Sequence, residues 1–266
     1  MDLELNGKIA IVTGGSRGIG KAIAWELARE GVGVAIVARG AEALEATAQE
    51  IANDTGQRIL PITVDTGKDE SVRAMVQQAV ESLGRLDILV NCAARPGGTG
   101  QVPTLQDITD DMFWEDMNIK VMGYLRCARE AAPHMRNQGF GRIINISGLA
   151  ARQTGSTIGS MRNVAVAAMT KNLADELGPY GINVTVVHPG ATRTEKTPQL
   201  MADQAQRQGI SVEEVERRMS QANSVHRIID AQDIANIVTF LASPKSVAIN
   251  GDAIAAGGGT VRAIHY

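Results

Sequence analysis

The sequence predicts an α/β protein whose doubly wound parallel sheet has about seven strands, with helices on both faces. Apolar runs typical of buried strands occur at 9–13, 33–38, 59–64, 86–92, 142–147, 182–188 and 252–256. Helical spacing of apolar residues occurs between them, at 19–30, 41–53, 69–82, 110–137, 158–178 and 231–242. Strands that alternate with helices in this way indicate βαβ units. Because the chain shows no linker and no shift in composition, we expect residues 1–266 to form a single domain.

The first strand–helix junction is rich in glycine. Residues 13–20 read Thr-Gly-Gly-Ser-Arg-Gly-Ile-Gly, with Gly14, Gly18 and Gly20 spaced GxxxGxG. Such a turn lets a phosphate approach the backbone, and the first N–H groups of the following helix bind its negative charge. The junction therefore predicts a dinucleotide site, and a tight turn without a ligand is the alternative.

A polar segment at about 195–226 interrupts the alternation, after the strand that ends at His188. Within it, Ser211-Val212-Glu213-Glu214 has the pattern of a capping box that begins a short helix. Insertions at the carboxyl ends of parallel strands line the ligand crevice. We therefore expect a lid over a substrate, with Met201 and Met219 indicating an adaptable apolar pocket. A surface excursion is the alternative.

The composition excludes several classes of protein. The 266 residues are 44% hydrophobic and 21% charged, which suffices for a full core. The formal net charge is −3 without a basic cluster, so no nucleic acid and no membrane is expected as a partner. Cys92 and Cys127 lie in apolar segments and no signal-peptide core begins the chain, so a cytoplasmic location with reduced thiols is expected. The four histidines are scattered, so no metal site is expected.

Further motifs are spread along the chain. They are Val64-Asp65-Thr66, Asn91-Cys92-Ala93-Ala94, Met117-Asn118-Ile119-Lys120, the strand Gly141–Ser147, Pro189-Gly190-Ala191-Thr192-Arg193-Thr194 and the segment Gly251–Gly259. Together with the glycine turn they resemble motifs of the short-chain dehydrogenase/reductase family over essentially the whole chain. The resemblance implies a Rossmann-type sheet, an oxidoreductase activity on a small-molecule carbonyl or alcohol, and a dinucleotide cofactor.

The resemblance also implies which residues bind the cofactor. They are Gly14, Ser16, Arg17, Gly18, Ile19, Gly20, Arg39, Asp65, Asn91, Ala93, Pro189, Gly190, Thr192 and Thr194. The second strand ends at Arg39 without a carboxylate, and Arg17 lies inside the glycine turn. Since an arginine accommodates a ribose 2′-phosphate where a carboxylate would repel it, we expect NADP(H). A solvated surface role for Arg39 is the alternative.

The family's catalytic pair, Tyr-x-x-x-Lys, is missing where the resemblance places it. The tyrosine position falls on Gly159 and the lysine position on Asn163. Glycine has no proton to donate, and a neutral asparagine cannot lower the pKa of a neighbour through charge. The serine of the family falls on Ser147 (Gly148 being the other choice), and its helix asparagine falls on Asn118.

Other groups are candidates for the missing acid. His188 ends a strand on the cofactor side and carries a group that titrates near neutral pH. Tyr124 and Tyr180 are weaker candidates, for which packing and turn roles are expected. Arginines 95, 152 and 162 are suited to holding an acidic substrate or polarising a carbonyl, since arginine does not shuttle protons.

Three functions are therefore open. The first is an NADP(H)-dependent oxidoreductase with a non-standard proton relay that uses Ser147, Asn118, His188 and Asn163. The second is a catalytically silent NADP-binding sensor or partner subunit. The third is a non-redox enzyme similar to the halohydrin dehalogenases, against which the intact glycine turn argues. In the family that the sequence resembles, the helices equivalent to 110–137 and 158–178 form the dimer interface. The resemblance and the small residues on these helices (Ala128, Ala131 and Ala132; Ala165, Ala167 and Ala168) therefore predict a homotetramer or homodimer, with packing on the protein's own sheet as the alternative.

Overall fold

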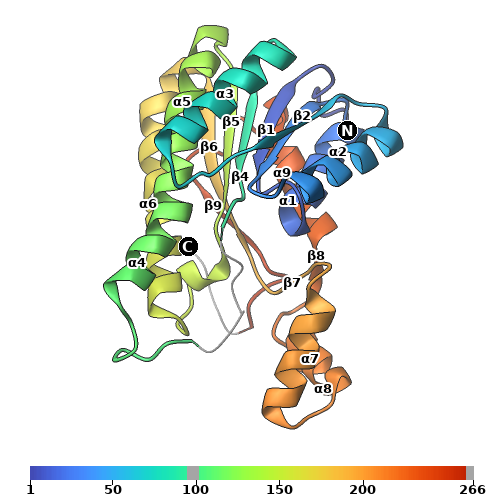
Figure 1. Cartoon of the computed structure of the whole chain (residues 1–266), viewed down its shortest axis with the longest axis vertical. Coiled ribbons are helices and arrows are strands. Elements are labelled where there is room, and N and C mark those ends of the chain that lie inside the picture. Colours follow the sequence, from blue (N-terminus) through green and yellow to red (C-terminus); the bar gives the residue numbers. More distant parts are fainter. Residues whose placement is uncertain (95–101, 262–266) are drawn as a thin grey trace.

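The computed structural model describes residues 1–94 and 102–261, and a parallel sheet of seven strands forms the centre of this part (Figure 1). The strands lie in the order β3-β2-β1-β4-β5-β6-β9. Their bounds are β1 Ile9–Thr13, β2 Gly33–Ala38, β3 Ile59–Thr63, β4 Ile88–Asn91, β5 Gly141–Ile146, β6 Ile182–Pro189 and β9 Ala253–Ala256. The predicted doubly wound α/β sheet is confirmed.

Helices cover both faces of this sheet (Figure 1). The first face carries α1 Gly18–Arg29, α2 Ala41–Thr55 and α9 Ala231–Ala242, and the second carries α3 Asp69–Leu83, α5 Gly123–Gln138 and α6 Thr157–Leu177. Strand side chains alternate between the two layers: Val12 packs with the first set of helices and Ile11 with the second. Strands buried on both faces are continuously apolar, and the apolar runs of the sequence therefore predict them. No helix that the structure describes is long and apolar enough to cross a membrane.

The helix expected over 110–137 is not one regular helix. α4 (Asp110–Met117) leads into a π-helical turn at Asn118–Met122, and α5 follows. Arg126 Nη1 donates to the carbonyl oxygen of Asn118 at 3.2 Å and so holds the widened turn. Turns of this kind occur frequently at functional sites.

The small residues of α5 do not form the expected assembly face. Ala128, Ala131 and Ala132 are buried against the protein's own sheet. They allow close packing of the helix on the strands. The helix face that carries them is therefore covered by the sheet of the same chain.

The predicted insertion forms two helices, α7 (Thr197–Gln208) and α8 (Val212–Gln221), between the paired strands β7 (Thr192–Arg193) and β8 (Ile229–Asp230). Ser211 Oγ accepts a hydrogen bond from the backbone N–H of Glu214 at 3.2 Å, as a helix start requires. Met201 and Met219 pack with Val215 between the two helices. Met201 is therefore part of the small core of the insertion, whereas the half-buried Met219 packs against this core and its expected place beside a pocket stays a prediction.

Candidate functional site

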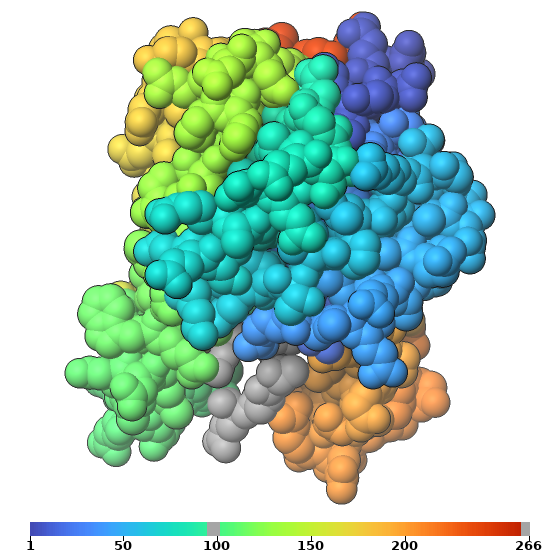
Figure 2. Space-filling view, turned by 45° about the horizontal axis from the view of Figure 1, so that its top comes forward, coloured from blue at the N-terminus to red at the C-terminus, as the bar shows by residue number. Residues whose placement is uncertain are grey.

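The site lies at the carboxyl edge of the sheet. The strand order reverses between β1 and β4, and ligand crevices of such sheets lie beyond the strand ends at this point. The glycine turn follows β1, Ser147 follows β5, and Pro189 ends β6. Figure 2 shows the α4 region and the α7–α8 insertion as two projections at one end of the molecule. The predicted segments, distant in sequence, thus meet at one edge.

The glycine turn has the geometry of a backbone cradle. Gly14 and Gly18 have φ angles of +70° and +57°, which side chains other than glycine rarely adopt. A Cβ on Gly20 would lie 2.3 Å from the carbonyl oxygen of Gly14, so only glycine lets α1 begin this close to the turn. Thr13 Oγ1 accepts hydrogen bonds from the N–H groups of Cys92 and Ala93 at 2.9 and 3.0 Å. This hydroxyl therefore fixes the segment after β4 against the turn.

A carboxylate accepts a hydrogen bond from the first N–H of α1. The N–H of Gly18 donates to Glu195 Oε2 at 3.1 Å, and the side chain of Thr194 lies beside Gly18. The Glu195 oxygen stands in for an anion at a helix N-terminus, where backbone N–H groups and the helix dipole bind negative charge. The turn therefore fits a phosphate-bearing cofactor. Glu195 would have to leave the N–H of Gly18 before a phosphate could bind there.

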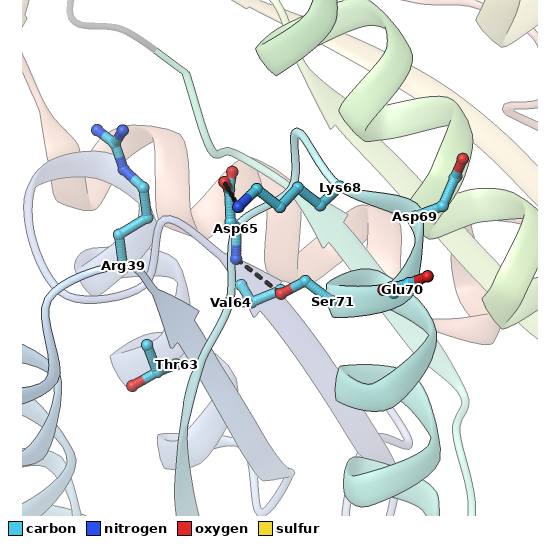
Figure 3. A pocket seen from close by; sticks show the side chains of 8 residues that line it. All are labelled: Arg39, Thr63, Val64, Asp65, Lys68, Asp69, Glu70 and Ser71. Carbon is cyan, nitrogen blue, oxygen red and sulfur yellow. Dashed lines mark hydrogen bonds and ion pairs between the residues drawn. The ribbon is translucent and has the colours of Figure 1, made fainter.

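A hollow of about 800 Å³ lies beyond the ends of β2 and β3 (Figure 3). Its lining residues are Arg39, Thr63, Val64, Asp65, Lys68, Asp69, Glu70 and Ser71. Asp65 Oδ1 accepts from the N–H of Gly67 at 3.0 Å, and Ser71 Oγ accepts from the N–H of Asp65 at 3.0 Å. The exposed Arg39 thus faces the space beside Asp65, while Arg17 stands at the start of α1 and does not line this hollow.

Buried amides connect β4 to α6 beneath the site. Asn91 Nδ2 donates to Asn145 Oδ1 at 2.9 Å, and Asn145 Nδ2 donates to Thr170 Oγ1 at 2.9 Å. Asn91 Oδ1 has no hydrogen-bond partner within the described residues. Since buried polar atoms are almost always paired, this oxygen is available to a bound group or water.

Ser147, Asn163 and Lys120 form a compact polar cluster. Ser147 Oγ donates to the carbonyl oxygen of Asn163 at 3.2 Å. Lys120 Nζ donates to the carbonyl oxygen of Ser147 at 2.9 Å and to Asn163 Oδ1 at 3.2 Å. His188 joins the cluster from β6, since its Nδ1 accepts from the N–H of Gly148 at 3.4 Å. The structure therefore brings three predicted residues together with one that the motifs do not predict.

Burial changes the pKa values of this cluster. Desolvation, followed by repulsion from Arg162, lowers the pKa of Lys120 to about 7. Desolvation raises the pKa of the Cys92 thiol to about 12 and that of Tyr124 well above its usual value. The thiol and the phenol therefore stay protonated at neutral pH, while the lysine amine titrates there.

Asn118 is not brought to Ser147. Its Nδ2 donates to the carbonyl oxygen of Gly67 at 3.4 Å, on the side of the α3 loop. Lys120, two residues further along the π-helical turn, carries the side chain that reaches the cluster. A lysine inside the apolar run Ile119–Met122 is the one sequence signal that could have indicated it.

The weaker candidates for the missing acid lie in other settings. Tyr180 stacks against Arg136, whose guanidinium carbon is 3.7 Å from the ring centre. Tyr124 is buried and donates to the carbonyl oxygen of Ile146 at 2.9 Å, closer to the cluster than its position on the helix predicts. Arg152 binds the carbonyl oxygen of Ala253. Arg95 lies outside the described residues.

The start of α6 contains the residue that we expect at the family's tyrosine position. Gly159, to which that position falls, is in the first turn of α6, and its N–H donates to Ser156 Oγ at 3.1 Å. Ser160 Oγ donates to the carbonyl oxygen of Gln153 at 3.0 Å. These hydroxyls therefore cap and brace the helix start.

The other residues predicted to bind the cofactor make contacts within the protein itself. Gly190 packs on Gly257 so closely that a Cβ would lie 2.9 Å from the Gly257 α-carbon. Thr192 Oγ1 donates to the Gly190 carbonyl oxygen at 3.0 Å. Ser16 accepts from Thr47 Oγ1 through its carbonyl oxygen at 3.0 Å, and Ile19 packs on the core.

The sheet, its reversal point and the glycine cradle define the class of dinucleotide-binding α/β proteins. Within that class, the chain belongs to the short chain dehydrogenase family, whose model matches residues 8–206. The predicted resemblance is thereby confirmed at the level of the family.

Several known proteins are similar over nearly the whole chain. The short-chain reductase protein NovJ of Streptomyces niveus is 36% identical, covering 94% of this chain and 93% of its own. The NADPH-dependent reductase BacG of Bacillus subtilis is 31% identical, covering 97% and 99%. Among solved structures, L-sorbose reductase of Gluconobacter frateurii, complexed with NADPH and L-sorbose, has a TM-score of 0.92 at 29% identity, covering 99% and 100%.

Proposed function

We propose that this protein is an NADP(H)-dependent oxidoreductase that interconverts a carbonyl and an alcohol through a non-standard proton relay. The cluster of Ser147, Asn163 and Lys120 carries this proposal, because it gathers polar groups and a titrating amine at the edge of the sheet where the glycine turn also lies. Relatives with NADPH in their names and complexes support the cofactor. When bound, the cofactor supplies the hydride chemistry.

Two regions would hold the cofactor. The N–H of Gly18 and the turn around Gly14 fit its phosphates, and Arg39 beside the hollow of Figure 3 fits a 2′-phosphate. Asp65 at the same hollow fits the adenine end. The segment Pro189–Thr194, which reaches back to Gly18, would enclose the other end.

The residues of the cluster divide the remaining work. Ser147 Oγ would hold the substrate oxygen, and the α7–α8 insertion would act as a lid over the substrate. His188 is tied to the backbone of Gly148, so it orients the segment that carries Ser147. A catalytic role of Asn118 would require its side chain to leave the carbonyl oxygen of Gly67.

Arg39 tests the choice of cofactor. An Arg39→Ala substitution is expected to weaken NADPH binding about 10- to 100-fold, because a charge-assisted contact with the 2′-phosphate is lost. NADH binding should stay within about twofold of wild type, since NADH has no such phosphate. Dissociation constants from cofactor fluorescence provide the measurement. Arg58→Ala, an exposed arginine at the opposite end of β3, is the control; equal losses for NADPH and NADH would contradict the assignment.

A catalytically silent subunit is the second candidate. The observation that favours it is the first turn of α6, where Gly159 offers no side chain to donate a proton. This reading predicts tight NADPH binding without turnover, and activity that returns when a second protein is added.

One experiment separates the two candidates. NADPH fluorescence is titrated with the protein, and ketones, aldehydes and quinones are then added in turn while cofactor absorbance is followed. Binding followed by substrate-dependent oxidation supports the oxidoreductase. Binding without oxidation supports the silent subunit, and the lack of binding contradicts both.

We also propose that the protein forms a homodimer or homotetramer. On α6, Met161 and Val164 are each 50% exposed. Ala168 is also exposed, and it lies four residues after Val164 on the same face of the helix. Trp114 on α4 is 66% exposed. A Val164→Glu substitution is expected to lower the mass measured by light scattering to that of a monomer; a wild-type monomer would contradict the proposal.

A further inference from the structure

Lys120 is a buried cation without a carboxylate partner. Its side chain comes from the π-helical turn, and the residue is 3% exposed. Both of its acceptors, the Ser147 carbonyl oxygen and Asn163 Oδ1, are neutral. Among the described residues no Asp or Glu forms an ion pair with it. Because burying an unpaired ammonium is costly, a fold that keeps one at a ligand crevice indicates a functional role.

The groups around Lys120 do not cancel its charge. On α4 and α6, Asp116 is held by Arg162 through two bonds of 2.8 and 2.9 Å. Cys92 faces Lys120 from the end of β4, and the ring of Tyr124 on α5 is 6.0 Å from Nζ. His188 approaches the same cluster from β6 through Gly148. Among these described groups, no carboxylate pairs with the Lys120 amine.

The Asn163 amide extends the Lys120 hydrogen bond toward Gly148, on the side away from the amine. Since its Oδ1 receives the Lys120 bond, its Nδ2 points the other way, 3.1 Å from where a Cβ on Gly148 would lie. A larger residue at 148 would cover this Nδ2. Hydrogen bonds in a chain polarise one another, so the Lys120 bond makes the Asn163 N–H a stronger donor.

We propose that Lys120 and Asn163 act as one unit, in which the Lys120 ammonium polarises the Asn163 amide and the amide N–H stabilises negative charge on a substrate oxygen beside Ser147. Lys120 is a positioning residue here, because it acts through Asn163. The proposal deepens the proposed function and rests on it, since it concerns the same site.

The charge state of Lys120 sets the expected pH dependence. With its pKa lowered to about 7, the amine is charged below that pH and neutral above it. Stabilising an oxyanion requires the charged form, so the rate of carbonyl reduction should fall as pH rises through about 7.

Relocating the charge tests this unit. Lys120→Met should lower kcat for reduction about 10²- to 10³-fold, the range for losing one oxyanion donor, and should flatten the pH profile between pH 6 and 9. Lys120→Met combined with Asn163→Lys returns a cation to α6 and should recover at least about tenfold of the loss. Lys171→Met, on the exposed side of α6, is the control and should match wild type. An unchanged rate and profile in Lys120→Met would overturn the proposal.

A second readout does not depend on turnover. NMR of lysine labelled at Cε identifies the Lys120 signal by its absence in Lys120→Met, and its midpoint should lie near pH 7. NADPH added at pH 7 should shift this signal. A midpoint below about 5, which would leave the amine uncharged at neutral pH, would overturn the proposal, because only the charged form polarises the amide. Absence of NADPH binding in wild type contradicts instead the proposed function, and the two failures are thereby distinguishable.

Discussion

The side chain of Glu195 lies where a cofactor phosphate would bind, at the start of α1. Its carboxylate accepts from the N–H of Gly18, the first residue of α1. A phosphate needs the same N–H, and two negative groups at one helix start repel each other. The exposed side chain can swing away, so the contact weakens cofactor binding without blocking it.

Glu195→Gln is therefore expected to bind NADPH more tightly, with a dissociation constant lowered about three- to tenfold. The amide keeps the size of the side chain and removes its charge. Fluorescence titration at low salt measures the change, which should shrink as salt screens the repulsion. Glu176→Gln, exposed on α6, controls for the general loss of one negative charge. Weaker binding by Glu195→Gln would show that the carboxylate assists the cofactor.

Single residues differed in how far the sequence predicted them. The glycines 14, 18 and 20 were readable because each is required by backbone geometry at a known place. Lys120 was not, because its role arises only where the π-helical turn and α6 meet, 43 residues apart in the chain. Asn118 is the residue of this segment that the sequence predicts for the site, but the turn directs its side chain to Gly67.

At the scale of elements, the strands and most helices followed from apolar periodicity. Parallel strands buried on both faces give continuous runs, and helices on one face give a stripe. The π-helical turn at Asn118–Met122 left no such signal, because one extra residue in a turn changes the register without removing the apolar stripe. The roles of Met201 and Met219 were also unreadable, since the pairing of α7 with α8 decides which faces are covered.

The insertion is expected to unfold separately from the sheet. Val215 is buried in the small cluster between α7 and α8, which is distinct from the clusters that hold the sheet. Val215→Asp buries a carboxylate there and should speed tryptic cleavage after Arg207 and Arg217 at least about tenfold. The main thermal transition should move little. Val212→Asp, on the exposed side of α8, is the matched control. If Val215→Asp lowered the temperature of the main thermal transition as well as speeding cleavage, the insertion would not be an independent unit.

At the scale of the whole molecule, the two ends of the parallel strands differ in how their buried polar groups are paired. The amino ends of the strands are closed by contacts such as Asp87, which is buried and accepts from Arg85 at 2.6 and 2.8 Å. The carboxyl ends instead leave Asn91 Oδ1 without a partner and Lys120 without a counterion in the described part of the chain. A molecule built in this way gives up stability at its site, and that loss should depend on pH.

Lys120 should contribute a stability that rises with pH. Its folded pKa is about 7 and its unfolded value is near 10.5, so between these pH values the unfolded chain binds a proton that the folded chain does not. The free energy of unfolding therefore increases with pH across this window, by up to a few kcal/mol. Removal of the amine in Lys120→Met abolishes this increase.

The buried thiols have the opposite effect, so a comparison of variants is needed. Burial raises the pKa values of Cys92 and Cys127 to about 12, and their contribution is present below the usual thiol pKa and lost as pH rises above it. Wild type and Lys120→Met both keep these thiols. Subtracting the melting temperature of Lys120→Met from that of wild type therefore removes most of the thiol contribution and leaves mainly that of the lysine. We expect this difference to rise by several degrees in favour of wild type between pH 7 and 9, as measured by thermal unfolding. A constant difference would mean that Lys120 keeps its proton in the folded protein, and the neutral form would then play no part at physiological pH.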